Sequence, residues 1–600
     1  MAAISFDRPR YNRESLRRSA SSLLAVVRGC PSFEVARDRL RARVSQLYFD
    51  TLRGRTELPS SELIRVRDCS SAMGTILSER ADARAGFSVT EALWDIARGH
   101  PRDDLQPGFY AEIIHMVEAL EGKARFQFTG NRRMRTGVSG RQAAKARSRE
   151  LDRLWSLAEA RMQQYAVGLA EESIERRAER RAKILDAFGA GSEEWNDWAW
   201  QIRHVVDTLD GLQKLVHLTD EERQGIERAT ANRLPFGVTP YYASLMDDET
   251  DGVRDRTLRA QVIPPTGYVE QMVAHRTNLE RSCDFMLESD TSPVDLVTRR
   301  YPAIVILKPF NTCPQICVYC QRNWEIDQVM APGALAPQAK IEAAMSWIER
   351  HPSVREVLIT GGDPFALSDS RLEKMLRRLA SIPHVDMIRF GTRTPVTLPM
   401  RIDDRLADML GSFREPGRRD VVVVTHVEHS YEVTPEMAQA VDRLRRAGLA
   451  VYNQHVFTFF TSRRFEAALL RMVLRRIGVE PYYTFAPKGK EETAAYRVPL
   501  ARLLQEQKEE ARLMPGTRRT DEAVYNVPGL GKNYLRARQH RDLLSILPDG
   551  SRVYEFHPWE KNVIEQDTYV GADVSILDYL ERLAAIGEDP GEYESIWYYY

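Results

Sequence analysis

Three of the six cysteines in this 600-residue chain lie within eight positions, as Cys313, Cys317 and Cys320. The segment just before them, residues 303–307 (Ala-Ile-Val-Ile-Leu), is apolar and β-branched, which predicts a buried strand. The three thiols are therefore expected on the loop that leaves a strand, which is where α/β barrels carry their chemistry.

The C-x3-C-x2-C spacing favours a [4Fe–4S] cluster. Such a cluster has four irons that each need a ligand, so three protein thiolates leave one iron open to a small molecule. A closed zinc site needs a fourth Cys or His nearby, but the first histidine after Cys320 is His351. A zinc site and unliganded core cysteines remain the alternatives. Disulfides are not expected, because the chain has no secretory features and too few cysteines for a disulfide framework. The spacing resembles that of radical S-adenosylmethionine (SAM) enzymes.

The composition excludes several classes of protein. The chain has 85 Lys+Arg and 85 Asp+Glu, so no net charge draws it to nucleic acid or anionic lipid. The chain has no run of about 18 apolar residues, so no membrane span is predicted. Residues 1–8 lack the apolar core of a signal peptide. We therefore expect a soluble cytoplasmic protein of two to four domains.

The chain divides into four predicted segments. Residues 1–190 form a helical extension of unknown role, and residues 191–300 form a second helical segment. Within the extension, apolar spacing predicts a helical face from Leu151 to Leu169, and the mixed charges of residues 171–183 predict a solvated helix. The basic run at 131–149 has no aromatic residues to stack on bases, so a solvated loop is preferred to an RNA contact.

Residues 301–490 alternate between strand and helix patterns, and a C-terminal segment, residues 491–600, follows them. Six strand–helix repeats imply an α/β fold with a parallel sheet, in the form of a partial (β/α)6 barrel. The strands are expected at residues 303–307, 356–360, 387–390, 421–426, 449–455 and 482–485.

Polar residues follow several of these strands. Gly361, Gly362 and Asp363 come directly after the second one, where glycines let a ligand approach the backbone closely. In a barrel that carries the cysteine loop, this segment predicts the site for the amino group of SAM. Arg393, His426 and Gln454 end later strands and are expected in the wall of the same pocket.

Lys532 lies in a glycine-rich segment, Val527-Pro-Gly-Leu-Gly-Lys532. A lysine on such a loop can form an imine with an aldehyde, which is how pyridoxal phosphate (PLP) is held. The segment is not a phosphate-binding P-loop, because it lacks the four-residue spacer and the Ser/Thr after the lysine.

From about Trp195 to Lys532 the chain resembles the lysine 2,3-aminomutase family of radical SAM, PLP-dependent enzymes. The first 190 residues have no counterpart in the basic family enzymes. Besides the cysteine loop and the Lys532 segment, the matching stretches are Trp195-Asn-Asp-Trp-Ala-Trp-Gln201, Thr239-Pro-Tyr-Tyr-Ala-Ser-Leu245, Arg300-Tyr-Pro302, Gly361-Gly-Asp363, Gly391-Thr-Arg-Thr-Pro-Val396, Thr425-His426, Asn453-Gln454 and Pro481-Tyr-Tyr483.

This resemblance implies a set of roles. Lys532 would carry PLP, with Arg300 and Tyr301 at the cofactor site, and Arg322 would pair with the substrate α-carboxylate, which suits its guanidinium fork. SAM, split by the reduced cluster, would provide the radical that removes a hydrogen from C3, after which the amino group moves from C2 to C3. The implied partners are an amino acid substrate and an electron donor such as flavodoxin or ferredoxin; a homo-oligomer is compatible with the family.

The resemblance also bears on the substrate. Lysine-using members place two aspartates around the substrate's distal ammonium, and the aligned residues here are Lys488 and Asn526. A lysine and an amide attract a carboxylate, so the positions resemble those of glutamate 2,3-aminomutases and predict L-glutamate as substrate, giving β-glutamate. The alternative for Lys488 is a solvated loop residue.

Departures from the family pattern leave other outcomes open. Ile304 replaces an arginine near the PLP site, Phe485 replaces a tyrosine, and the Lys532 loop is one glycine short. The alternatives are the same chemistry on lysine or aspartate, or a non-mutase reaction on a larger substrate docked by the N-terminal helices. An electron carrier is a different class, but it would need neither the Gly-Gly-Asp segment nor Lys532.

Overall fold

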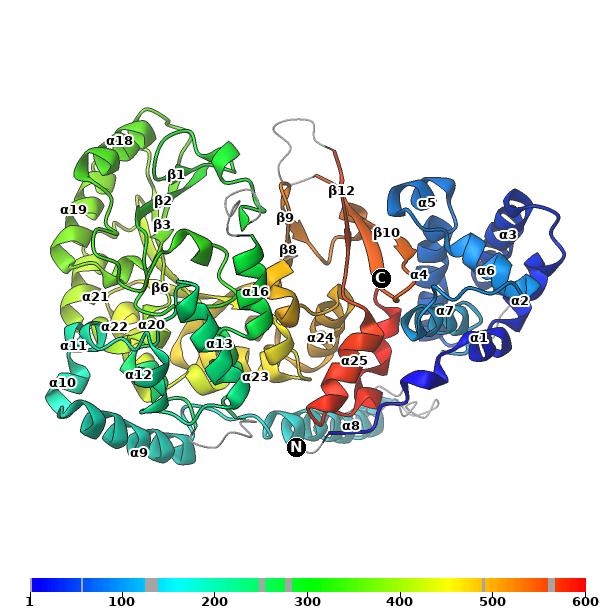
Figure 1. Ribbon diagram of the computed structural model, residues 1–600, viewed down its shortest axis with the longest axis horizontal. Coiled ribbons are helices and arrows are strands. Elements are labelled where there is room, and N and C mark those ends of the chain that lie inside the picture. The colour runs from blue at the N-terminus through cyan, green and yellow to red at the C-terminus, as the bar shows by residue number, and fades with distance from the viewer. Residues whose placement is uncertain are drawn as a thin grey trace. The chain divides into compact units, whose positions relative to one another are not determined.

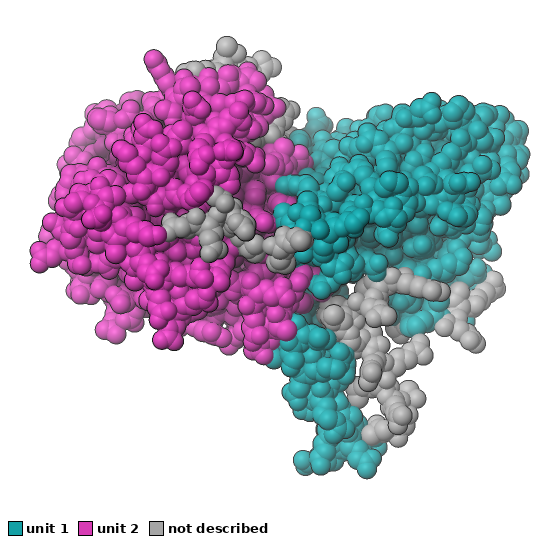
Figure 2. Space-filling view, turned by 60° about the horizontal axis from the view of Figure 1, so that its bottom comes forward, with its two compact units in different colours: residues 1–158, 498–513, 532–600 teal, residues 159–497, 514–531 magenta. Residues whose placement is uncertain are grey.

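The computed structural model describes residues 3–54, 58–124, 139–247, 254–275, 283–487, 491–558 and 567–600. The chain forms two compact units, coloured separately in Figure 2. Unit 1 combines residues 1–158, 498–513 and 532–600, and unit 2 combines residues 159–497 and 514–531. The N-terminal extension thus shares a unit with most of the C-terminal segment. The division at residues 190, 300 and 490 stays a prediction.

Unit 2 is built on a parallel sheet whose strands follow one another in chain order (Figure 1). The short β1 (Val297–Thr298) pairs antiparallel with β2, and each following pair from β2 to β8 is parallel. The sheet is open, so the predicted α/β class with a partial barrel is confirmed. The parallel strands are β2 (Ile304–Phe310), β3 (Glu356–Gly361), β4 (Met387–Gly391), β5 (Asp420–Thr425), β6 (Ala450–Val456), β7 (Val479–Ala486) and β8 (Glu522–Val527), and the chain then leaves unit 2 in β9 (Gly531–Tyr534).

Burial alternates along the strands, so successive side chains face opposite sides of the sheet. In β6, Val451, Asn453 and His455 are buried, whereas Tyr452 and Gln454 are half-buried. The helices pack their apolar side chains with those of the strands in one core. Because β2 to β8 run parallel, their carboxyl ends lie at the same edge of the sheet, and polar groups near those ends gather there. The helices of unit 2 are α9 (Glu171–Phe188), α10 (Ser192–Asn196), α11 (Trp198–Arg203), α12 (Leu209–Gln213), α13 (Asp220–Ala231), α14 (Pro240–Ala243), α15 (Arg256–Val262), α16 (Thr266–Ala274), α18 (Gln338–Glu349), α19 (Asp369–Ala380), α20 (Thr394–Thr397), α21 (Asp404–Gly411), α22 (Pro435–Arg446) and α23 (Glu466–Ile477).

Unit 1 consists of helices around a three-stranded antiparallel sheet. Helices α4 and α5 pack against β10, and α7 packs against α25 and the 3-10 segment η12 (Pro590–Tyr598). The C-terminal aromatic residues, Trp597 among them, are buried in this unit. Its elements are α1 (Arg13–Ser19), α2 (Ser21–Arg28), α3 (Phe33–Leu52), α4 (Ser60–Ile76), α5 (Glu79–Ala85), α6 (Val89–Arg98), α7 (Pro107–Leu120), most of α8 (Gly140–Met162), α24 (Leu500–Leu513), α25 (Ile576–Ala585), β10 (Arg541–Ile546), β11 (Arg552–Phe556) and β12 (Tyr569–Ala572).

Two details of the predicted N-terminal helices were wrong. Helix α8 ends at Met162, short of Leu169, and Leu151 is 48% exposed, so the predicted face is not continuous. Helix α9 is not simply solvated, because Arg177 and Arg180 are buried and form ion pairs with Glu436 and Asp247. The basic run at 131–149 was predicted to be a solvated loop. Residues 131–138 lie outside the described residues, whereas residues 140–149 are helical and begin α8, so the loop prediction was wrong for that part. Among the helices that the structure describes, none combines the length and apolar character needed to cross a membrane.

Candidate active site

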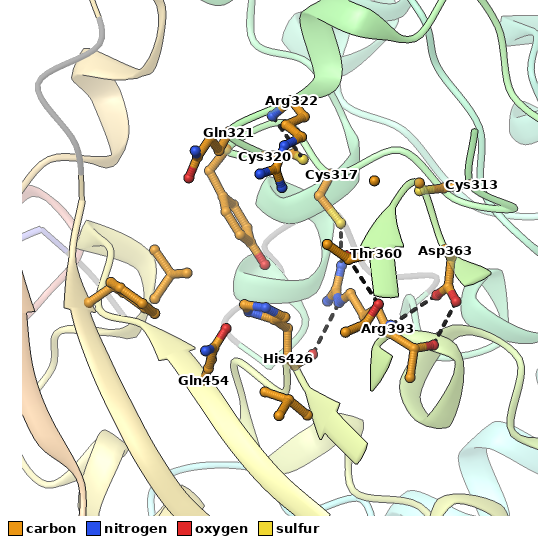
Figure 3. A pocket seen from close by; sticks show the side chains of 18 of the residues that line it. Cys313, Cys317, Cys320, Gln321, Arg322, Thr360, Asp363, Arg393, His426 and Gln454 are labelled. Atoms are coloured by element: carbon orange, nitrogen blue, oxygen red, sulfur yellow. Dashed lines mark hydrogen bonds between the residues drawn. The ribbon is translucent and has the colours of Figure 1, made fainter. Parts of the chain in front are cut away.

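A cavity of about 280 Å³ opens in unit 2 where the parallel strands end (Figure 3). It brings together the polar residues that follow different strands, as the sequence predicted. The predicted residues that line it are Cys313, Cys317, Cys320, Arg322, Gly361, Gly362, Asp363, Arg393, His426, Gln454 and Asn526.

Backbone hydrogen bonds fix the cysteine loop from both sides. Ile316 N donates to Gly237 O at 3.1 Å, and Val318 N donates to Gln261 O at 2.8 Å. The three thiols are half-buried and unpaired by disulfides. Figure 3 shows them together on one side of the cavity. Burial raises the pKa of the Cys317 thiol to about 11, so the thiolate needs nearby positive charge.

The donor set fits an iron–sulfur cluster better than a single metal ion. Sulfurs around one tetrahedral zinc lie about 3.8 Å apart, given Zn–S bonds of about 2.3 Å. Among the described residues, the group whose ligand atoms all lie within 4.8 Å is Asp542, Glu555 and His557, not the cysteines. Both amide atoms of the buried Gln315, which lines the cavity, lack a hydrogen-bond partner among the described residues. A bound group in the cavity would satisfy this amide.

The two glycines at the end of β3, Gly361 and Gly362, are required by the backbone of the cysteine loop. A Cβ on Gly362 would lie 2.0 Å from Thr312 O, and Gly361 has a φ of +115°. Gly362 N donates to Phe310 O at 2.7 Å, and Asp363 N donates to Thr312 O at 3.0 Å. The glycines therefore allow a close approach of two backbone segments, their own and the residues that lead into Cys313.

The Asp363 carboxylate links the ends of β3 and β4. Its Oδ1 accepts hydrogen bonds from Thr392 Oγ1 at 2.6 Å and Phe365 N at 3.0 Å, and its Oδ2 accepts one from Arg393 N at 2.9 Å. Burial raises the pKa of this carboxyl. Both oxygens are thus engaged by the protein, although the residue lines the cavity.

Arg393 lies beneath the cysteine loop, and each of its three guanidinium nitrogens contacts the protein. Nη1 donates to Cys317 Sγ at 2.8 Å, Nη2 contacts Glu432 Oε1 at 2.7 Å and Gln261 Oε1, and Nε donates to His426 O at 3.2 Å. Glu432 is also fixed by Tyr242, whose hydroxyl donates to Oε1 at 2.8 Å. The positive charge next to Cys317 is thereby compensated in the protein interior.

Behind the cavity wall, Glu428 lies between two histidines. Its carboxylate oxygens are 3.8 Å from His426 Nδ1 and 3.9 Å from His455 Nε2, and Oε2 accepts a hydrogen bond from Val456 N at 2.6 Å. Burial raises the pKa of Glu428 to about 8. His429 contacts Glu466 at 3.1 Å.

Arg322 borders the cavity on the other side of the cysteine loop. Its guanidinium faces the buried Glu288, with Nη2 at 2.7 Å from Oε1 and Nε at 3.2 Å from Oε2. Lys308 Nζ lies 3.3 Å from the same carboxylate.

The remaining predicted residues are placed less directly. Lys488 lies outside the described residues. Lys532 is the second residue of β9 and belongs to unit 1, so its role with PLP stays a prediction. Arg300 donates through Nη2 to Met286 O at 2.5 Å, and its buried Nε has no hydrogen-bond partner among the described residues. An arginine with a free N–H fits the phosphate of PLP. Tyr301 follows Arg300 in the turn before β2.

Sequence reasoning missed the acidic partners of the site. Glu288 and Glu432 are 34 and 39 positions away from the arginines that they pair with, so no local pattern connects them. It also missed Arg389 in β4, which lines the cavity and donates to Tyr482 Oη at 3.0 Å. A charged residue inside a predicted buried strand was the signal that could have revealed Arg389.

Comparisons with known proteins agree with this geometry. The model of the radical SAM superfamily matches residues 307–470. A KamA family protein of Methanocaldococcus jannaschii is 45% identical over 591 residues, which cover 95% of this chain and 94% of the relative. This chain belongs to the KamA family. The family predicted from the motifs is thereby confirmed, and with it a radical SAM enzyme that uses a [4Fe–4S] cluster, SAM and PLP.

Two further KamA-family relatives match about half of the chain. An L-lysine 2,3-aminomutase of Bacillus subtilis is 35% identical over 52% of this chain and 63% of the relative. A glutamate 2,3-aminomutase of Clostridioides difficile is 33% identical over 54% of this chain and 72% of the relative. The chain is about equally identical to the lysine and the glutamate enzyme, so sequence identity does not decide the substrate. The chemistry of the cavity has to decide it.

Proposed function

We propose that this KamA-family enzyme is an amino acid 2,3-aminomutase that acts on L-glutamate and forms β-glutamate. The charge of the cavity carries the proposal. Asp363 is the one carboxylate among the described residues that line it, and both of its oxygens already accept hydrogen bonds. The described lining therefore offers no free carboxylate to a substrate ammonium, whereas Arg322 and Asn526 offer hydrogen-bond donors.

On the cofactor side, the three cysteines would hold the cluster. The backbone after β3, with His426 and Gln454 in the wall, would hold SAM. On the substrate side, Arg322 would bind the α-carboxylate and Asn526 would donate to the distal carboxylate. Lys532 is the proposed PLP lysine. Arg300, whose Nε–H has no partner among the described residues, is proposed as a cofactor contact.

The chemistry of the bound groups and the work of the chain are separate. When bound, the cluster with SAM supplies a hydrogen-abstracting radical, and PLP supplies the conjugated group through which the amino nitrogen can move. The chain itself orients the substrate by its carboxylates and shields the reacting carbons from water. Buried polar contacts of this kind raise the rate by placing the reacting atoms close together.

An anaerobic assay tests the proposal. The reconstituted enzyme, with SAM, PLP and a strong reductant, is offered L-glutamate, L-aspartate and L-lysine separately, and each product mixture is searched for a β-isomer by derivatised mass spectrometry. We expect the isomer from L-glutamate. Deoxyadenosine without an isomer from any of the three would contradict the proposal and favour a larger substrate.

Asn526→Asp sharpens the assay. A carboxylate at this position repels the distal carboxylate of glutamate and attracts an ammonium, so we expect the preference for glutamate over lysine to fall at least about tenfold. Asn526→Gln, which keeps the amide, is the matched control. An unchanged preference in the aspartate variant would remove Asn526 from the substrate site.

A further inference from the structure

The Arg322–Glu288 pair has the geometry of a two-point clamp. Arg322 Nη2 and Nε each face one oxygen of the same carboxylate, at 2.7 Å and 3.2 Å. Both side chains are largely buried, with 14% and 9% of their surfaces exposed. Two parallel hydrogen bonds fix the plane of a guanidinium as well as its position. The contact therefore determines which edge of Arg322 points elsewhere.

Glu288 is itself held rigidly. Its backbone N donates to Asp284 Oδ1 at 2.8 Å, and its carboxylate accepts a hydrogen bond from Gln321 Nε2 at 2.9 Å. Lys308 Nζ adds a second cation at 3.3 Å. Although burial opposes ionisation, Arg322 and Lys308 hold the pKa of Glu288 at about 2. The carboxylate is thus ionised and fixed at neutral pH.

The clamp leaves one edge of the guanidinium without a partner among the described residues. Arginine has five N–H groups; Glu288 takes the Nε–H and one hydrogen of Nη2. The two hydrogens of Nη1 and the second hydrogen of Nη2 remain, and Arg322 lines the cavity. These remaining donors form the end edge of the fork, which also matches a carboxylate at two points.

We propose that Glu288 is a positioning residue that fixes Arg322 so that the end edge of its guanidinium receives the α-carboxylate of the amino acid substrate. The inference rests on the proposed function, because it assigns Arg322 to that carboxylate. It adds a residue that does not itself touch substrate.

The opposite role makes an opposite prediction. If Glu288 were a placeholder that substrate must displace, weakening its hold on Arg322 would make substrate bind more tightly. As a positioning residue, its loss leaves a buried cation free to rotate, and the substrate must then fix the side chain itself. The sign of the change in KM separates the two roles.

Glu288→Gln is the decisive variant. The amide keeps the size of the side chain but turns a donor toward the guanidinium, so one of the two hydrogen bonds is lost. We expect KM for L-glutamate to rise about 10- to 100-fold, with kcat within about threefold of the parent value, since misplacement of a binding group acts on substrate capture. Deoxyadenosine formation from SAM without substrate should be unchanged.

Two further variants control for folding. Glu288→Asp keeps the charge and should restore part of the loss, which a general loss of structure would not do. Glu325→Gln removes the neighbouring acid that lies 4.0 Å from Lys308, and KM should change less than about threefold. Iron content and the thermal midpoint are compared for all variants.

Binding is also measured without turnover, as the shift of the thermal midpoint by L-glutamate in the PLP-loaded enzyme. We expect a concentration for half-maximal shift that rises by the same factor as KM in Glu288→Gln. An unchanged or lowered value in that variant would overturn the inference. If the parent enzyme makes no β-isomer but still binds L-glutamate, the proposed mutase reaction fails while this binding test still decides the role of Glu288. If the parent binds no L-glutamate, both fail.

Discussion

Two arginines line the cavity, and each forms an ion pair with a buried glutamate, but the two pairs have different functions. We call the surroundings of Arg393 and Glu432 the Arg393 wall, and those of Arg322 and Glu288 the Arg322 wall. Arg393 faces Glu432 at 2.7 Å, and Arg322 faces Glu288 at 2.7 Å. The Arg393 guanidinium is also bound by Cys317, Gln261 and the His426 carbonyl, so each of its three nitrogens contacts the protein. Arg322 keeps one edge without a partner among the described residues, beside the cavity.

The difference suggests how a buried charge pair comes to serve structure or binding. A guanidinium whose three nitrogens all contact protein stabilises its surroundings and has few donors left for a ligand. A guanidinium clamped on one edge is equally ordered but still has donors available. Substitutions in the first wall should therefore reduce stability and disturb the cluster, and substitutions in the second should mainly weaken substrate binding.

The largest effect is expected in the cysteine loop, which both walls adjoin. Cys317→Ala removes a cluster ligand, so we expect iron content and the visible absorbance of the cluster to fall sharply and activity to fall below detection. The buried Cys69 in unit 1, whose thiol donates to Met116 O at 3.2 Å, provides the control. Cys69→Ala should retain iron; equal iron loss in both variants would contradict the assignment.

Gly362→Ala tests whether the Arg393 side of the cavity depends on the close approach of the Gly362 backbone to Thr312. A Cβ 2.0 Å from Thr312 O forces the cysteine loop to move, so we expect a loss of about 3 kcal/mol or more in the free energy of unfolding together with reduced iron content. Gly267 in α16 has open space around its missing Cβ, and Gly267→Ala should stabilise by up to about 1 kcal/mol. Denaturant unfolding and iron analysis measure both variants.

Arg393→Met leaves Glu432 buried without its counterion. Breaking such a pair costs about 3–5 kcal/mol, measured by urea unfolding. Adding Glu432→Gln should recover part of the loss, because the amide oxygen can still accept from Glu428 N. Arg322→Met should cost less, since Glu288 keeps Lys308 and Gln321 as partners. Equal costs in the two walls would break the comparison.

The smallest effect concerns Glu428 and depends on pH. The folded protein holds the Glu428 proton up to a pKa of about 8, whereas the unfolded chain releases it near 4.5. Stability from this group is therefore complete below pH 4.5 and is lost as the pH rises toward 8. Glu428→Gln stays neutral, so we expect it to exceed the parent in stability by about 1–3 kcal/mol at pH 8 and less at pH 5.

Urea unfolding at pH 5 and pH 8 measures this difference. The solvent-exposed Glu349→Gln should show no comparable pH dependence. A Glu428→Gln variant less stable than the parent at pH 8 would mean that the Arg393 wall needs this second charge.

Much of unit 2 could be predicted from sequence, and the reasons are physical. Strands β2 to β7 are continuous apolar or alternating runs bounded by helices, so their periodicity placed them within a few residues. The strands of unit 1 were not predicted, because β10 and β11 contain buried charged residues such as Arg552 and Glu555 and therefore lack an apolar pattern. The cysteines and glycines are local motifs, whereas the Glu288 and Glu432 contacts exist only once the chain has folded.

The discontinuous make-up of unit 1 has a consequence for synthesis. Glu112 in α7 forms a buried ion pair with Arg552, 440 positions later in the chain. At about 5–20 residues per second on the ribosome, α7 would emerge roughly 20 to 90 s before its partner exists. Over that interval the first helices must keep their apolar faces from associating wrongly, while all of unit 2 is made. Chaperone dependence and slow maturation are therefore expected of unit 1 rather than of the unit that carries the cysteines.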